Sequence, residues 1–180
     1  MTATMTLILA LLTMAAQALF AAGLIYFLIY RRTENDLRLN FIKKQGIKLA
    51  FLVALLAVSG SLFYSEIAGY APCDLCWFQR IFMYPQVIIL GLAIIKKERR
   101  IIDYSLALAV IGWLIALYHN YAGWGGASLT VCTAAVSGAC LRRYVFAFGY
   151  ITIPLMSLTA FSLLILILAA ARSLFKKFNS

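Results

Sequence analysis

The residues in this sequence best suited to chemistry are its four cysteines, which fall into two pairs. Cys73 and Cys76 form a C-x-x-C motif, and Cys132 and Cys140 have the wider spacing C-x₇-C. Four cysteines allow three disulfide connectivities, and the spacing favours pairing within each motif unless exchange between the pairs is their purpose. A C-x-x-C disulfide closes a very small loop and restrains little chain entropy, which favours a redox centre over a static clamp.

A metal site is the other alternative for the C-x-x-C motif, because zinc sites use the same spacing. The sequence has a single histidine, His119, and the second cysteine pair is spaced too widely for a typical zinc site. We therefore expect a thiol–disulfide redox centre and no bound metal.

The neighbours of the motif favour a reactive thiolate. Pro72 precedes the motif and residues of helical character follow it, so we expect Cys73 and Cys76 in the first turn of a membrane helix. The partial positive charge of a helix N-terminus lowers the pKa of a nearby thiol. Arg80 follows Cys76 by one helical turn within an apolar segment. We expect it to stabilise a thiolate and to hydrogen-bond an acceptor that becomes anionic on reduction, with a snorkelling anchor as the alternative.

The elements that must position these residues are membrane helices. The sequence is 64% hydrophobic and 12% charged, more apolar than a soluble domain of this size can hide. Crossing the hydrocarbon takes about 20 mostly apolar residues in a helix, and the alternation typical of a membrane barrel is absent. We predict an all-α integral membrane protein with five spans: Thr4–Tyr30, Ile47–Ala68, Leu75–Ile95, Ile101–Tyr121 and Tyr144–Ala171.

The positions of the basic residues behind the net charge of +10 reflect membrane topology and do not indicate nucleic-acid binding. Basic residues gather between the first and second spans, between the third and fourth, and after the last. All three groups fall on one side if every span crosses, which is the positive-inside pattern of a cytoplasmic face. We therefore expect the N-terminus outside, the C-terminus in the cytoplasm and all four cysteines on the extracytoplasmic side, where disulfides persist.

The first apolar stretch has a second interpretation as a cleaved signal peptide, because Ala16–Ala18 resembles a small-residue cleavage site. However, Met1–Met5 carries no basic side chain, and the apolar run continues to Tyr30 before it meets Arg31. We interpret the stretch as a membrane span.

An electron acceptor is required, since a protein that makes disulfides for others loses two electrons in each cycle. The sequence contains neither a Rossmann glycine pattern nor the C-x-x-C-H motif of covalent haem. At the rim of a bilayer a lipid-soluble quinone is the least demanding acceptor, so we expect ubiquinone or menaquinone.

The sequence around the motif resembles the signature of the disulfide bond formation protein B family (DsbB), in its short-loop BdbC-type branch. The signature run is Pro72–Arg80, and the resemblance covers about Gly46–Leu174. Four further segments carry it: Ser61–Glu66, Ile81–Pro85, Leu117–Asn120 and Phe148–Leu155.

The resemblance implies a four-helix transmembrane bundle in a bacterial cell (inner) membrane. Thr4–Tyr30 is then an additional span, so we expect an N-terminal helix with its cytoplasmic connection over 1–45 and an oxidoreductase domain over 46–180.

The resemblance also implies an electron relay. A reduced thioredoxin-fold thiol oxidase, similar to DsbA or BdbD, attacks the Cys132–Cys140 disulfide, and Cys132 forms the mixed disulfide. Cys140 then exchanges with Cys73, and Cys76 engages the quinone with the help of Arg80. The short spacing of the loop pair limits how far Cys140 can travel.

Two further residues are candidates for the quinone site. Trp77 directly follows the motif and is close enough to shape a quinone pocket, although it also suits an interfacial aromatic belt. His119 lies near the outer end of its span and is expected to line the pocket or to move protons, unless it is a helix-end histidine capped by backbone or water.

Two other functions compete with a thiol:quinone oxidoreductase. A vitamin K epoxide reductase-like enzyme has similar parts, but there the loop cysteines precede the C-x-x-C, whereas here they follow it. A non-enzymatic membrane scaffold with two structural disulfides would give Arg80 and the tight motif no special role.

Overall fold

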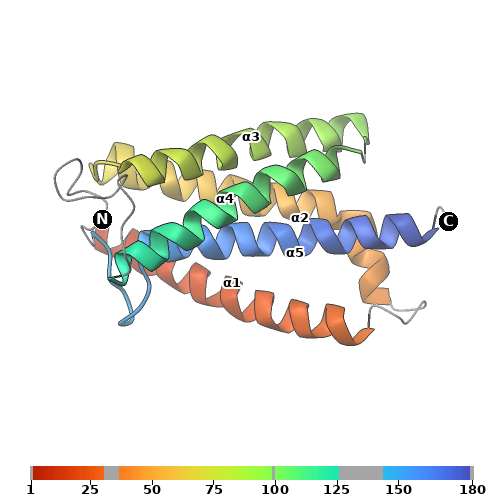
Figure 1. Ribbon diagram of the computed structural model, residues 1–180, viewed down its shortest axis with the longest axis horizontal. Helices are drawn as coiled ribbons and strands as arrows, with labels where there is room; N and C mark the ends of the chain where they lie inside the picture. Colours follow the sequence, from red (N-terminus) through yellow and green to blue (C-terminus); the bar gives the residue numbers. More distant parts are fainter. Residues whose placement is uncertain (1, 31–36, 99, 126–143, 179–180) are drawn as a thin grey trace.

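A computed structural model describes residues 2–30, 37–98, 100–125 and 144–178 of the chain (Figure 1). Five helices are long and apolar enough to cross a membrane, and the described residues contain no strand beyond one isolated bridge between Ala147 and Ile151. The prediction of an all-α membrane protein is confirmed. The elements are α1 (Thr2–Tyr30), α2 (Leu37–Leu62), the π-helix η1 (Phe63–Ile67), α3 (Asp74–Lys96), α4 (Ile101–Gly123) and α5 (Ile153–Phe178).

Helices α2, α3, α4 and α5 form a bundle, and α1 lies alongside α5 (Figure 1). Helix α5 contacts α2 and α4, while α3 contacts the same two helices from the other side. Successive helices run in alternating directions, so the chain's N-terminus and the start of α3 lie at one end of the bundle. The C-terminus and the turn between α3 and α4 lie at the other end.

Small side chains let the helices of the bundle approach closely, as expected where lipid gives no hydrophobic drive for helix association. The core contains Ala50 and Ala54 of α2 and Ala109 and Ala116 of α4, all fully buried. Large residues of α5 fill the space between them, notably Phe161.

Buried polar side chains link neighbouring helices, because a polar group in hydrocarbon needs an internal partner. The Gln86 amide of α3 donates to the carbonyl oxygen of Ser105 in α4 at 2.8 Å, and the Ser105 hydroxyl donates back to the amide oxygen of Gln86. Between α4 and α5, the Trp113 indole donates to the Ser162 hydroxyl at 2.9 Å.

The start of the last helix differs from the prediction. The last helix begins at Ile153 and not at Tyr144, because Phe148 and Gly149 have φ values of 51° and 78°, which interrupt a right-handed helix. Helix α2 is continuous from Leu37 to Leu62. The division of the chain into 1–45 and 46–180 stays a prediction.

Gly112 of α4 tests how closely the bundle is packed. A Cβ atom at this position would clash with Cε1 and Cζ of Phe161, so Gly112→Ala forces the ring or the helix to move. We expect the free energy of unfolding to fall by about 1–3 kcal/mol, as for other overpacked sites. Thermal unfolding in detergent, followed by circular dichroism, measures this.

The matched control is Gly91→Ala in α3, where the nearest atom, Cε2 of Phe51, is at an ordinary contact distance of 3.4 Å. Equal unfolding midpoints for the two variants would contradict the close packing of α4 on α5.

Candidate active site

The chain that leads into the C-x-x-C motif is held against the end of α2. The π-helix η1 ends with a hydrogen bond from the Ala68 amide to the Phe63 carbonyl at 2.9 Å, and the Tyr70 amide donates to the Tyr64 carbonyl at 2.9 Å. The ring of Tyr70 stacks on Tyr64 on one side and on Tyr144 on the other, with centroid distances of 5.9 and 4.8 Å. This stack fixes the segment from which Cys73 emerges.

Cys73 is the N-cap of α3, and Cys76 lies in the first turn of that helix. The Cys73 sulfur accepts a hydrogen bond from the Cys76 amide at 3.4 Å, which satisfies one of the free amides of the helix start. The two sulfur atoms lie 2.9 Å apart as a dithiol. The predicted placement of the motif at a helix start is therefore confirmed.

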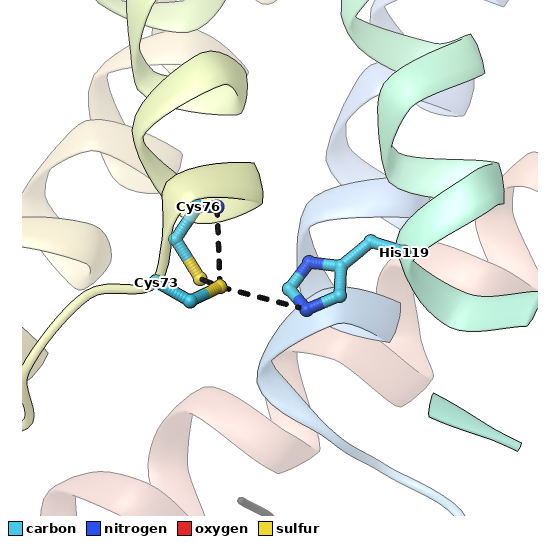
Figure 2. A group of neighbouring side chains, drawn as sticks. All are labelled: Cys73, Cys76 and His119. Atoms are coloured by element: carbon cyan, nitrogen blue, oxygen red, sulfur yellow. Dashed lines mark hydrogen bonds between the residues drawn. The ribbon is translucent and has the colours of Figure 1, made fainter. Parts of the chain in front are cut away.

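His119 of α4 points at these sulfur atoms, as Figure 2 shows. Its Nε2 lies 3.8 Å from the Cys73 sulfur, and both side chains are almost fully buried. The Gln79 amide nitrogen lies 2.9 Å from Nδ1. Because an amide nitrogen can only donate, Nδ1 accepts in this arrangement, so the proton of a neutral imidazole sits on Nε2 and faces Cys73.

The Cys73 thiol is not acidified in the dithiol form. Its hydrogen bond with Cys76 and its burial raise its pKa to about 12, while the contact with His119 acts in the opposite direction. The expectation that the helix N-terminus lowers the pKa of the motif is therefore wrong for Cys73, because the hydrogen bond with Cys76 and burial of the thiol outweigh the helix dipole.

Arg80 lies one helical turn below Cys76 and is anchored to α2. Its Nε donates to the Ser61 hydroxyl and its Nη2 to the Ser61 carbonyl, both at 3.0 Å. Its guanidinium also lies 5.3 Å from the centroid of the Trp77 ring. These contacts hold a cation at a fixed depth within an apolar span.

A cavity of about 410 Å³ brings most of the predicted site residues together. Cys73, Cys76, Arg80 and His119 line it, along with apolar side chains of α1, α2 and α5. Trp77 does not line this cavity; its side chain is 52% exposed and reaches the site only through its contact with Arg80.

The cavity also contains polar atoms without partners. Among the described residues, the Tyr84 hydroxyl and the Asn120 side-chain oxygen are buried with no hydrogen-bond partner, and both residues line the cavity. Unsatisfied buried polar atoms of this kind fit a site that receives a ligand or water. The cavity thus combines an apolar body with a few polar groups next to a dithiol.

The same sulfur and nitrogen atoms also form a group that suits a soft metal ion. The ligand atoms of Cys73, Cys76 and His119 lie within 4.8 Å of one another. Two cysteines and one histidine are the ligand set of some zinc sites. The presence of only one histidine was an argument against zinc in the sequence. The fold nevertheless places that histidine, His119, beside the C-x-x-C motif.

Two of the predicted site residues lie outside the described part of the chain, namely Cys132 and Cys140. Gln79 and Ser61, which orient His119 and Arg80, were not predicted as site residues. Both lie within segments that carry the family resemblance, and Gln79 is also a polar side chain inside an apolar helix, which in a membrane protein usually has a purpose.

Comparisons with known proteins identify the family of this chain. The family described as "Disulfide bond formation protein DsbB" matches residues 43–171. A "Probable disulfide formation protein C 1" of Bacillus cereus is 46% identical over 122 residues, which cover 66% of this chain and 87% of the relative. The "Disulfide bond formation protein C" of Bacillus subtilis is 42% identical over 121 residues, covering 65% of this chain and 85% of the relative.

A third relative comes from another bacterial genus. The "Probable disulfide formation protein" of Deinococcus radiodurans is 40% identical over 132 residues, covering 69% of this chain and 86% of the relative. No solved structure shows significant similarity. The matched region includes the C-x-x-C motif, Arg80 and His119 but not α1. These matches confirm the resemblance seen in the sequence, and the chain belongs to the disulfide bond formation protein DsbB family.

Proposed function

We propose that this protein is a membrane thiol:quinone oxidoreductase, which reoxidises an extracytoplasmic thioredoxin-fold thiol oxidase and passes the electrons to a quinone. Membership of the DsbB family gives the chain a role in disulfide bond formation; the quinone and the thioredoxin-fold donor are the parts we propose. The observation that carries the proposal is the cavity in which the Cys73–Cys76 dithiol meets a fixed arginine and apolar walls.

The reaction balances as a transfer of two electrons and two protons. Oxidation of the Cys73–Cys76 dithiol forms one S–S bond and releases two electrons and two protons. The quinone takes up the electrons and protons and leaves as the quinol. The dithiol of the partner reduces the Cys132–Cys140 disulfide and is itself oxidised to a disulfide. The resulting Cys132–Cys140 dithiol then reduces the Cys73–Cys76 disulfide and becomes oxidised again. The order of this relay rests on the family resemblance.

Each residue around the dithiol has a role in this proposal. Cys76, which is less buried than Cys73, faces the acceptor, and Arg80 donates to the quinone oxygen on which negative charge develops. The Nε2–H group of His119 stabilises the Cys73 thiolate, whose formation burial makes costly. Trp77 acts through Arg80 by covering one face of its guanidinium.

The proposed orientation places this site on the extracytoplasmic side of a bacterial cell membrane. It is supported by the position of Lys96, Lys97 and Arg100, which lie at the end of the bundle opposite the start of α3 (Figure 1).

Cys76→Ser tests the reaction itself. Protein in nanodiscs is mixed with a reduced thioredoxin-fold partner and a short-chain quinone, and quinone absorbance and partner thiols are followed. We expect the wild-type protein to consume one quinone for each disulfide formed and Cys76→Ser to abolish both signals, because the serine hydroxyl cannot form the disulfide.

An unchanged unfolding midpoint shows that Cys76→Ser leaves the fold intact. If this variant reduced quinone at the wild-type rate, the assignment of Cys76 would be wrong. Stoichiometric zinc in the purified wild-type protein, with no quinone reduction, would instead indicate that Cys73, Cys76 and His119 form a metal site.

Arg80→His tests the binding of the acceptor. We expect the KM for quinone to rise about tenfold or more, since a hydrogen bond to a charged group contributes about 1.5–3 kcal/mol. Ser61→Ala keeps the arginine but removes one of its anchors, so its effect should be smaller and in the same direction. An unchanged KM for Arg80→His would leave only the role of a membrane anchor.

His119→Phe tests thiolate stabilisation through the rate of dithiol oxidation. The Cys73 pKa of about 12 means that the thiolate fraction rises with pH throughout the accessible range. We therefore expect His119→Phe to slow single-turnover oxidation of the dithiol by a similar factor at every accessible pH, because the thiol titrates above this range with or without the histidine. Gln79→Leu, which removes the donor to Nδ1, should cause a smaller change of the same kind.

The readout that separates this role from a structural one is a slower oxidation at an unchanged unfolding midpoint, with the same slope of log rate against pH in both proteins. Equal single-turnover rates in the wild-type protein and in His119→Phe would contradict thiolate stabilisation by the histidine.

A further inference from the structure

Helix α1 lies outside the region that matches the DsbB family, yet it is built into the bundle. Leu9 packs on Gly60 of α2, and Gly23 packs on Leu166 of α5, so that an added Cβ would lie within 3.3 and 3.1 Å of these leucines. Gln17 adds a polar contact, because its amide nitrogen donates to the hydroxyl of Thr159 in α5 at 3.3 Å. These contacts fix α1 against both neighbouring helices.

One face of α1 forms a wall of the cavity that contains the dithiol. The cavity-lining residues recur every three or four positions, as one helical face requires. They include Leu9, Leu12, Thr13, Ala16 and Leu19. Cys76 and Arg80 of α3 line the same cavity. The space beside the redox cysteines therefore extends to α1, which lies outside the region that matches the family.

The α1 wall is apolar in its chemistry. Its one polar side chain here, Thr13, donates its hydroxyl to the Leu9 carbonyl of its own helix at 2.8 Å and so needs no partner from the cavity. The polar atoms without partners, on Tyr84 and Asn120, belong to α3 and α4. The cavity is thus lined by redox and polar groups from α3 and α4 and by hydrocarbon from α1.

We propose that α1 forms the binding wall for the isoprenoid tail of the electron acceptor, while the quinone ring lies at Cys76 and Arg80. This inference rests on the proposed thiol:quinone function. A molecule with a polar ring and a branched hydrocarbon tail matches a cavity whose polar atoms and apolar wall come from different helices. The additional span then contributes to the choice of acceptor, and not only to anchoring.

Ala16→Phe tests the proposal by filling the α1 side of the cavity. The matched control is Ala18→Phe, which adds the same ring to the same helix at an exposed position that does not line the cavity. KM is measured in nanodiscs for two acceptors with the same ring, one without a tail and one with two isoprene units.

We expect Ala16→Phe to raise KM for the tailed quinone about tenfold, the effect of losing one or two buried methylene groups, and to leave KM for the tailless ring within about twofold. Ala18→Phe should change neither value.

Two results would overturn the role of α1. Equal KM values of Ala16→Phe and Ala18→Phe for the tailed quinone would mean that lipid chains cover this wall. An equal rise for the tailed and the tailless acceptor would mean that Ala16→Phe disturbs the ring site. Failure of the wild-type protein to reduce either quinone would instead overturn the proposed function, so the two failures are distinguishable.

Discussion

The contact of the Cys73 sulfur with Cys76 and His119 joins the start of α3 to the end of α4 at one end of an apolar bundle. The position of the motif at a helix start matters because a cysteine in the middle of a span would be out of reach of any water-borne partner. Cys73 satisfies the helix start as its N-cap, and the tyrosine stack behind it keeps the incoming chain in place. The rest of the site is arranged around this fixed pair of thiols.

Polar side chains within the membrane spans hold the bundle together and shape the site at the same time. Gln79 in α3 bonds His119 in α4, and Arg80 in α3 bonds Ser61 in α2. Without these partners each group would carry a large desolvation cost in hydrocarbon. Since the bonds run from α3 to both of its neighbours, a change in the packing of the bundle would move the histidine and the arginine relative to the thiols.

The orientation of the Gln79 amide decides what His119 can do. With its nitrogen toward Nδ1, the imidazole donates to Cys73 and favours the thiolate. Rotation of the amide would present its oxygen to Nδ1, move the imidazole proton there and leave Nε2 free to accept a proton from the thiol. A single buried amide thus links the two roles that a histidine can take beside a cysteine.

The features that the sequence predicted well depend on local signals. Long apolar runs predicted the five helices, and Pro72 before the C-x-x-C predicted its place at a helix start. The late start of α5 was missed because left-handed backbone at Phe148 leaves no clear trace in an apolar sequence.

Contacts between helices could not be predicted in the same way. The pairing of Gln79 with His119 joins residues 40 positions apart and exists only once α3 lies against α4. The cavity wall on α1 likewise depends on where that helix docks, which hydropathy does not specify. The roles of Cys132 and Cys140 stay predictions, since both lie outside the described residues.

In the proposed reaction, the Cys73–Cys76 dithiol gives its electrons directly to a quinone. A single turnover of a protein carrying Cys132→Ser and Cys140→Ser, reduced, freed of reductant and mixed anaerobically with an excess of quinone, isolates this step from the loop cysteines and from the partner. We expect one quinol formed per protein, together with a Cys73–Cys76 disulfide detected by mass spectrometry. A dithiol that stays reduced while the quinone stays oxidised would contradict it.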